Sequence, residues 1–160
     1  YDSLKFERGD IAEYDANAPA DMVVTLHACD TATDYALHNA VCRGARMILS
    51  VPCCQHELNG QIASDKLKLI TRYGIIKERF AALMTDAIRA NLLESRGYKT
   101  QVLEFVDLSH TPKNLLIRAI KKRPALDNAG RIALDEAKAL MEEFSLEPTL
   151  YSLLYPHSAD

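Results

Sequence analysis

Two short apolar runs separated by a helical stretch set the fold class of this chain. Residues 22–26 and 46–51 are almost continuously apolar, as expected for parallel strands buried on both faces. Between them, Leu37, Ala40 and Val41 share one face of a predicted helix. A strand, a helix and a second strand in this order predict an α/β fold with a largely parallel sheet.

The remaining segments predict further helices and one antiparallel strand pair. Residues 4–8 have the pattern of a short strand. Residues 98–108 and 115–120 predict two more strands, and their brief connection leaves no room for a helical crossover, so they should pair antiparallel. Helical periodicity is present in residues 62–73, 76–92 and 128–144, and the tail 146–154 should pack on the body.

The caps of the first predicted helix can also be assigned from the sequence. Thr31 and Asp34 have the spacing of a capping box at its start. Gly44 stands where a helix commonly ends with a left-handed glycine. These two signals place the helix between residues 31 and 43.

Length and composition fit one domain. The chain has 160 residues, of which 48% are hydrophobic and 26% charged, enough to bury a core without metal or disulfides. A net charge of −3 excludes a globally basic nucleic-acid binder. No apolar run approaches the ~20 residues of a membrane span, and the first residues are no signal peptide. Because the chain does not begin with Met, we expect a processed or truncated piece.

The four cysteines indicate a reducing compartment. They are Cys29, Cys42, Cys53 and Cys54. Cys53 and Cys54 are adjacent and cannot easily form a disulfide with each other. The spacing differs from the disulfide frameworks of secreted proteins, so a cytoplasmic location is the natural expectation.

Polar side chains gather after the two apolar strands. His27, Cys29 and Asp30 follow the first, and Cys53, Cys54 and His56 follow the second. Consecutive parallel strands are often neighbours, and ligands bind beyond their carboxyl ends. The sequence therefore predicts that these residues line one crevice. A structural alternative stays open for each residue, because cysteines are often core residues and Asp30 is a suitable helix cap.

Two chemistries fit this set. His27-x-Cys29 and Cys53-Cys54-x-His56 offer nitrogen and sulfur ligands for zinc, but the spacing is unlike the usual Cys-x2–4-Cys knuckle. Adjacent cysteines seldom chelate one ion together, so no metal ligand is assigned. Cys53 could instead be a nucleophile, with a histidine nearby to favour its thiolate. A buried structural thiol fits the same position.

The same residues carry a family resemblance. Residues 21–34, 49–57 and 110–114 resemble the motifs of class I S-adenosylmethionine-dependent methyltransferases. A related pattern occurs in a family of tRNA ribose 2′-O-methyltransferases. The resemblance runs from about residue 4 to residue 120. It implies a Rossmann-like α/β sheet of order three-two-one-four-five-seven-six, in which strands six and seven form the antiparallel last pair.

The resemblance also implies roles for individual residues. S-adenosylmethionine is the implied cofactor. The implied cofactor-binding residues are Gly9, Asp10, Ile11, His27 and Ala28. The implied catalytic residues are His27, Asp30 and Cys53. The implied substrate-binding residues are Thr33, Asp34, Cys54 and His56. His27 or Asp30 would orient or deprotonate a hydroxyl or amine acceptor, whereas Cys53 would add to a pyrimidine ring first.

One departure limits this resemblance. None of the six glycines is spaced as Gly-x-Gly, so the loop that cradles the cofactor in this family is missing, as is the acidic residue that holds the ribose. The sequence therefore predicts a single domain, residues 1–160, that is the C-terminal portion of a methyltransferase without its first two strands, ending in a helix and tail over 127–160.

A bare sheet edge follows from this truncation. Without the first two strands of the family, residues 22–26 would form an apolar edge that invites pairing with another chain. We expect that edge to be covered by a second copy, by a missing segment or by a rearranged N-terminus. A homo-oligomer such as a dimer is one of these solutions.

The sequence leaves two classes of function open. The first is a methyltransferase, with RNA as the acceptor suggested by family analogy alone. The second is a non-catalytic metal- or partner-binding module that kept the sheet and lost the cofactor loop. Cofactor binding and metal content distinguish the two classes.

Overall fold

A four-stranded mixed sheet forms the centre of the computed structural model, which describes residues 3–14, 18–106 and 114–156. Its strands are β1 (Met22–Leu26), β2 (Met47–Val51), β3 (Tyr98–Glu104) and β4 (Leu115–Lys121). They lie in the order β1-β2-β4-β3. β1 and β2 are parallel, and β4 is antiparallel to both β2 and β3. The predicted α/β class and antiparallel last pair are confirmed. The prediction of a largely parallel sheet is wrong, because only β1 and β2 pair in parallel.

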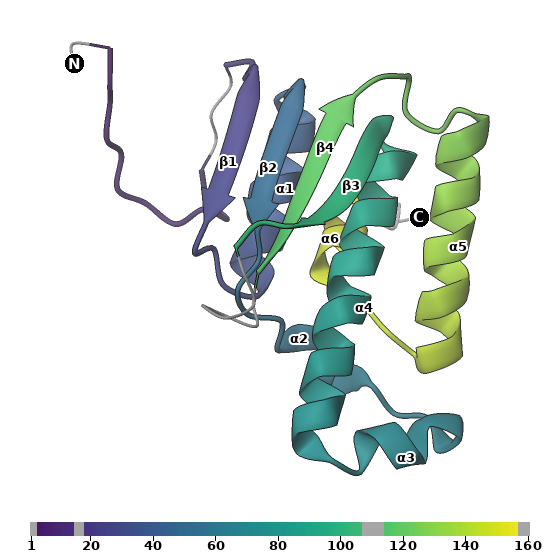
Figure 1. Cartoon of the computed structure of the whole chain (residues 1–160). Coiled ribbons are helices and arrows are strands. Elements are labelled where there is room, and N and C mark those ends of the chain that lie inside the picture. The colour runs from purple at the N-terminus through teal and green to yellow at the C-terminus, as the bar shows by residue number, and fades with distance from the viewer. Residues whose placement is uncertain (1–2, 15–17, 107–113, 157–160) are drawn as a thin grey trace.

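Helices connect and cover these strands (Figure 1). The connection from β1 to β2 is α1 (Thr31–Cys42), and the connection from β2 to β3 ends in the long α4 (Gly74–Ser95). α5 (Asn128–Phe144) packs against α4, and α6 (Thr149–Leu154) packs against α1. The shorter elements after β2 are α2 (Glu57–Gln61), the 3-10 turn η1 (Asp65–Leu67) and α3 (Lys68–Thr71).

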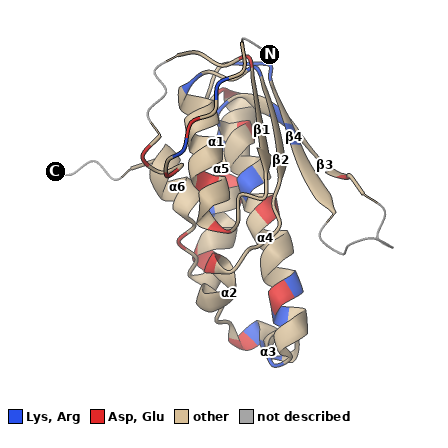
Figure 2. Cartoon of the chain, turned by 90° about the vertical axis from the view of Figure 1, so that its left-hand side faces the viewer, with Lys and Arg blue, Asp and Glu red and all other residues tan. Residues whose placement is uncertain are grey.

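The helices α1, α4, α5 and α6 gather on one side of the sheet (Figure 2). Side chains facing this side, such as Ile48, Ile117 and Ala119, are completely buried in the core. On the opposite face of the sheet, the alternate residues of β1 are exposed to solvent, and Val24 is 50% exposed. Among the described residues, therefore, helices cover only one face of the sheet. The parallel sheets of ordinary α/β proteins are covered on both faces.

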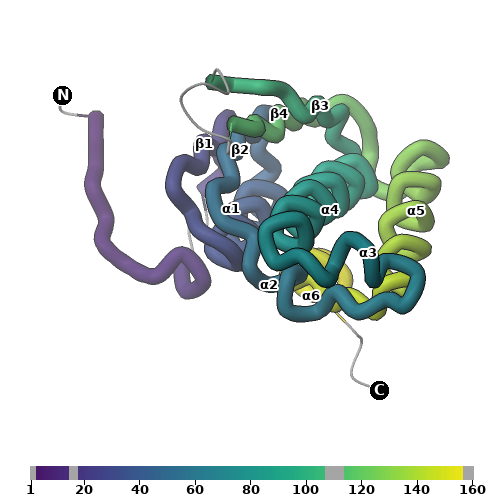
Figure 3. Tube along the Cα trace, turned by 60° about the horizontal axis from the view of Figure 1, so that its bottom comes forward, coloured from purple at the N-terminus to yellow at the C-terminus, as the bar shows by residue number. Residues whose placement is uncertain are grey.

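The N-terminal segment runs outside β1 without pairing with it (Figures 1 and 3). The predicted strand at residues 4–8 is wrong, since these residues are exposed and form no strand. Phe6 is 90% exposed, so the segment lacks the contacts that would hold it extended against the sheet. β1 is the edge strand in the single chain, and its covering by a second copy remains a prediction.

The capping box predicted at the start of α1 is wrong, and the glycine predicted at its end is confirmed. Asp30, not Thr31, precedes α1, and no side-chain cap is formed there. Gly44 adopts φ +66° just after the helix and donates its N–H to the Val41 carbonyl. Asp127 caps α5 by accepting a hydrogen bond from the Gly130 N–H at 2.8 Å.

The helix predicted at residues 128–144 and the predicted packing of the tail are both found in the structure. α5 spans the predicted residues 128–144, and the tail places Leu146, Leu150 and Leu154 in the core. No helix within the described ranges combines the length and apolar character that crossing a membrane requires.

Candidate functional site

The carboxyl ends of β1 and β2 meet as predicted. The two strands are in register, so that Leu26 pairs with Val51 at their ends. A backbone hydrogen bond of 3.1 Å then runs from the Asp30 N–H to the Cys54 carbonyl. The loop 27–30 and the loop 52–56 are thereby held together at one edge of the sheet.

Three of the four cysteines come together at this edge. The Sγ atoms of Cys29, Cys53 and Cys54 all lie within 4.8 Å of one another. Cys29 Sγ and Cys53 Sγ are 3.1 Å apart and share a hydrogen bond. All three residues are free thiols, with Cys29 exposed and the other two half-buried. The three thiols thus lie together where the ends of the two strands meet, as the sequence predicts.

The environment of Cys53 keeps its thiol protonated. Its hydrogen bond with Cys29, followed by burial and the neighbouring Cys54, raises the pKa of Cys53 to about 12. A nucleophilic cysteine needs the opposite shift, because the thiolate is the reactive form. In this arrangement the Cys53 thiol is a hydrogen-bonding group at neutral pH.

Asp30 ties the two loops together through its side chain. Its Oδ1 accepts hydrogen bonds from the N–H groups of His56 at 2.8 Å and Glu57 at 3.0 Å. These N–H groups stand at the start of α2, where unpaired donors need an acceptor. The Asp30 carboxylate is therefore a fixed acceptor between the loops, and its position is set by both of them.

The backbone of the first loop is strained. His27 and Asp30 adopt φ values of 58° and 53°, in the left-handed region that non-glycine residues rarely occupy. Such residues concentrate at functional sites, where the surrounding contacts hold them. The His27 side chain is exposed at the end of β1, and the His56 side chain is exposed after β2.

The predicted substrate-binding residues Thr33 and Asp34 lie inside the protein. The Thr33 hydroxyl donates a hydrogen bond to the Ala28 carbonyl, within the first loop. Asp34 is 2% exposed and both of its carboxylate oxygens accept from Arg89. The polar atoms of both side chains are hydrogen-bonded inside the protein. These residues therefore support the loop and are not available to bind a substrate at its surface.

A buried ionic network contacts both loops, 27–30 and 52–56. Arg89 on α4 donates from Nε and Nη2 to the two oxygens of Asp34, each at 2.8 Å. Its Nη1 donates to Asp86 at 3.2 Å, and Nη2 also donates to the Asp30 carbonyl at 2.9 Å. Gln55 donates to the second oxygen of Asp86 at 2.9 Å. The network therefore joins α1, α4 and both loops of the crevice.

This network contains two carboxylates and one guanidinium. Burial raises the pKa of Asp34 despite the nearby Arg89. Burial likewise raises the pKa of Asp86 to about 6, and the Asp34 carboxylate adds to the effect. Hydrogen bonds to the two acids raise the pKa of Arg89 against the opposing effect of burial. The Asp86 carboxyl therefore takes up a proton near pH 6, well above the range of an ordinary aspartate.

This shift predicts a pH-dependent effect of Asp86→Asn. The pKa of Asp86 is about 6 when folded against an ordinary 3.8, so the folded state binds the proton more tightly and its stability falls as the pH rises between these values. Relative to the wild type, the variant should gain about 2 kcal/mol of unfolding free energy between pH 4 and pH 7. Urea denaturation followed by circular dichroism at several pH values measures this difference.

Asp65→Asn is the matched control for this experiment. Asp65 lies in η1, where it is exposed and pairs with Lys68 at 2.8 Å. Its substitution should leave the pH dependence unchanged. A difference between Asp86→Asn and the wild type that stays constant or shrinks as the pH rises contradicts the assignment.

The C-terminal tail also reaches the site. Glu57 Oε1, at the start of α2, accepts hydrogen bonds from the Thr149 N–H at 3.0 Å and the Thr149 hydroxyl at 2.5 Å. Burial raises the pKa of Glu57. The loop that carries Cys53 and Cys54 is thus attached to α6 as well as to Asp30.

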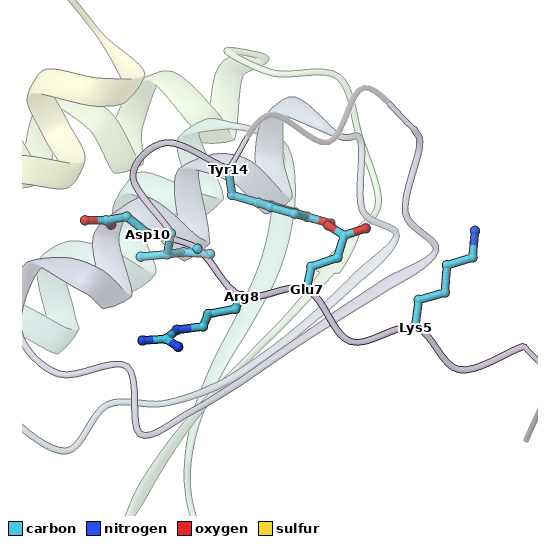
Figure 4. Close-up of a pocket in the computed structure, with 7 residues that line it drawn as sticks. Lys5, Glu7, Arg8, Asp10 and Tyr14 are labelled. Carbon is cyan, nitrogen blue, oxygen red and sulfur yellow. The ribbon is translucent and has the colours of Figure 1, made fainter.

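The predicted cofactor-binding residues Gly9, Asp10 and Ile11 line a separate cavity. Its volume is about 560 Å³, and Figure 4 shows that its other walls come from the same N-terminal segment. Lys5, Glu7, Arg8 and Tyr14 complete the lining. Asp10 Oδ1 accepts a hydrogen bond from the Ala12 N–H at 2.9 Å, and Asn39 of α1 donates to the Ile11 carbonyl at 3.0 Å. The second bond fixes this segment to the body.

The sequence did not reveal the residues that support the crevice. Arg89, Asp86 and Gln55 are absent from the predicted set. Asp86 and Arg89 stand three residues apart on one helix, the spacing of an ion pair, which was the available signal. Asp34 is 55 residues from Arg89, and no local pattern predicts such a distant pairing. Residues 110–113, which belong to the third segment that resembles the family, lie outside the described residues, so that part of the resemblance is untested.

Comparison with known proteins finds a family match in the N-terminal part of the chain. Residues 1–61 match the sequence model of a family described as a methyltransferase domain. No curated protein and no solved structure matches the chain. The matched range contains β1, α1, β2 and α2, and with them all three clustered cysteines. The predicted resemblance to a methyltransferase family is therefore confirmed over the matched residues 1–61.

Proposed function

We propose that the chain acts in S-adenosylmethionine-dependent methyl transfer, as the C-terminal portion of a methyltransferase domain. The family match over residues 1–61 carries this proposal. The strand order supports it, because β1-β2-β4-β3 agrees with the order four-five-seven-six of the class I family. In that correspondence the loops after β1 and β2 are the two that face the methyl donor and the acceptor.

The cavity of the N-terminal segment fits part of the cofactor. Its volume of about 560 Å³ lies within the ~300–1,000 Å³ of small-molecule sites. Asp10 is exposed there, and its carboxylate can accept hydrogen bonds from an adenine amine or a ribose hydroxyl. The chain contains no Gly-x-Gly loop, so we expect its affinity for the cofactor to be weak.

The bound cofactor would supply an electrophilic methyl group on a sulfonium. The protein's part is then to hold the acceptor in line with that group, and such positioning accounts for much of the acceleration in reactions of this kind. The exposed His27 imidazole can accept a proton from a hydroxyl or amine acceptor. Asp30 positions that loop through its bonds to His56 and Glu57.

A covalent route through Cys53 is the alternative for a pyrimidine acceptor, although the raised pKa of the Cys53 thiol disfavours it. In that route the Cys53 sulfur adds to the ring before methyl transfer. Replacing Cys53 by alanine separates the two routes, because full transfer activity in Cys53→Ala excludes the covalent one.

RNA is the acceptor class that we propose to test first. It rests on family analogy and on one surface feature, the tip formed by α3 and the start of α4. There the Arg72 guanidinium lies 4.9 Å from the centre of the Tyr73 ring, and Tyr73 is 47% exposed. Unpaired RNA bases stack on such aromatic and guanidinium planes. Labelled methyl transfer to RNA, with protein as the competing acceptor, tests this class.

Replacing Asp10 by alanine should weaken S-adenosylmethionine binding. A hydrogen bond to a charged group contributes ~1.5–3 kcal/mol, so the dissociation constant should rise at least about tenfold. Isothermal titration calorimetry with the purified chain measures it. Asp65→Ala, which changes an exposed aspartate outside the cavity, should bind as the wild type does.

The same titration tests the proposed function. If the folded chain shows no S-adenosylmethionine binding at millimolar concentration, the proposal for this chain fails. The non-catalytic module then becomes the better description. Equal affinities of Asp10→Ala and the wild type would instead show that the cofactor binds elsewhere.

A further inference from the structure

The cysteine cluster has the dimensions of a metal site. Tetrahedral zinc with Zn–S bonds of ~2.3 Å places its sulfur ligands about 3.8 Å apart. The three Sγ atoms lie within 4.8 Å of one another, and those of Cys29 and Cys53 are 3.1 Å apart. Small side-chain rotations therefore bring all three to ligand distance of one ion.

The two loops that carry the thiols are fixed without a metal. Parallel pairing of β1 with β2 aligns the loops, and the Asp30 N–H binds the Cys54 carbonyl at 3.1 Å. The Asp30 side chain, next to Cys29, accepts from two N–H groups just beyond Cys54. A site whose ligand positions are already ordered loses little conformational entropy on binding.

The Cys29 thiol supplies the ligand that the adjacent pair Cys53 and Cys54 lacks in the sequence. Neighbouring cysteines in one loop make a poor chelate by themselves, and the spacing here has no zinc knuckle. In the structure, however, Cys53 and Cys54 both approach Cys29, which comes from the other loop. The ligand set is therefore assembled across two strand ends and could not be recognised from local spacing.

We propose that Cys29, Cys53 and Cys54 together bind one thiophilic cation, with Zn²⁺ as the ion and its fourth coordination position open. Thiolates favour zinc and monovalent copper over harder cations. Cys29 is exposed, so the ion is reached from solvent. Each thiol releases its proton to solvent as its sulfur–zinc bond forms. Three protein ligands and one open position are the arrangement of catalytic zinc sites, whereas structural sites are closed by a fourth ligand.

This site does not depend on the proposed methyl transfer. The ion would lie at the edge of the sheet where the acceptor is expected. The open position would allow an acceptor atom with a lone pair to coordinate the metal. The site can equally serve the non-catalytic alternative, so metal binding and cofactor binding are measured separately.

Zinc titration of the reduced chain tests the proposal. The chain is freed of metal with a chelator and kept under a reductant that does not bind zinc. Zinc is then titrated in competition with a chromophoric chelator. We expect one zinc per chain, and Co²⁺ in its place should show thiolate-to-metal charge-transfer absorption. Removing one ligand, as in Cys29→Ser, should weaken zinc binding at least about tenfold.

Cys42→Ser is the matched control. Cys42 is exposed on α1 and contacts His38 at 3.4 Å, outside the cluster. It should bind zinc as the wild type does. Far-ultraviolet circular dichroism confirms that each variant is folded, and Cys54→Ser provides a second test if Cys29→Ser is not. The proposal is overturned if the reduced wild type binds less than one zinc per chain. It is also overturned if Cys29→Ser or Cys54→Ser weakens zinc binding no more than Cys42→Ser does.

Discussion

Replacing Arg89 with methionine should lower the free energy of unfolding by about 3–5 kcal/mol. The Arg89 side chain is 2% exposed and holds Asp34, Asp86 and the Asp30 carbonyl. Methionine fills a similar space but leaves two buried carboxylates without a cation. Breaking a buried ion pair from one side is costly because the remaining charge has neither water nor a partner. Urea denaturation at neutral pH, followed by circular dichroism, measures the loss.

Two further variants make this result specific. Arg79→Met changes an exposed arginine of the same helix and should alter stability by less than about 0.5 kcal/mol. Adding Asp34→Asn and Asp86→Asn to Arg89→Met removes the uncompensated charges, so the triple variant should regain much of the loss. If Arg89→Met were as stable as Arg79→Met, the network would not stabilise the fold.

Replacing Gly97 with alanine should destabilise the protein by about 3 kcal/mol or more. Gly97 separates α4 from β3 and adopts φ +89°. A Cβ atom here would lie 2.2 Å from the Arg123 carbonyl oxygen and 2.9 Å from the Pro124 carbonyl. These obstacles are backbone atoms, so no side-chain rotation relieves them. Thermal or urea unfolding of the purified variant gives the loss directly.

Gly60→Ala is the control for Gly97→Ala. Gly60 lies in α2, and a Cβ atom there would have no neighbour within 4 Å. Alanine is favoured over glycine inside a helix by ~1 kcal/mol, so this variant should be at least as stable as the wild type. Similar losses at both positions would mean that the close approach at Gly97 is not what limits substitution.

The elements that the sequence predicted best are those with strong local signals. The run from Asn128 to Phe144 carries a clear 3.6-residue apolar periodicity, and its bounds agree with α5. The brief connection between residues 108 and 115 forces an antiparallel pair, and β3 and β4 form it. Residues 4–8 resemble a strand locally, but a strand needs a partner, and the described chain offers none to this segment.

The candidate site was predicted in position but not in its internal arrangement. Ligands bind beyond the carboxyl ends of neighbouring parallel strands, and this rule predicted that the residues around Cys29 and Cys53 lie close together. The structure brings their thiols together. The burial of Asp34 could not be predicted, because it depends on Arg89 of α4, which donates a hydrogen bond to the Asp34 carboxylate inside the protein. An arginine on a helix is expected at the surface. Only the distant acid explains its burial, and pairings across 55 residues leave no periodic signal.

The one-sided packing of the sheet affects how this protein behaves in common folding assays. Met22, Val24 and Leu26 remain exposed in the native chain, and they form a continuous apolar strip along β1. Dyes that fluoresce on exposed apolar surface are commonly used to detect loosely packed molten globules. The folded chain offers such dyes a surface while its core, with Tyr98 completely buried, stays packed. For this protein, dye fluorescence therefore reports the open face of the sheet, and near-ultraviolet circular dichroism of the tyrosines reports its packing.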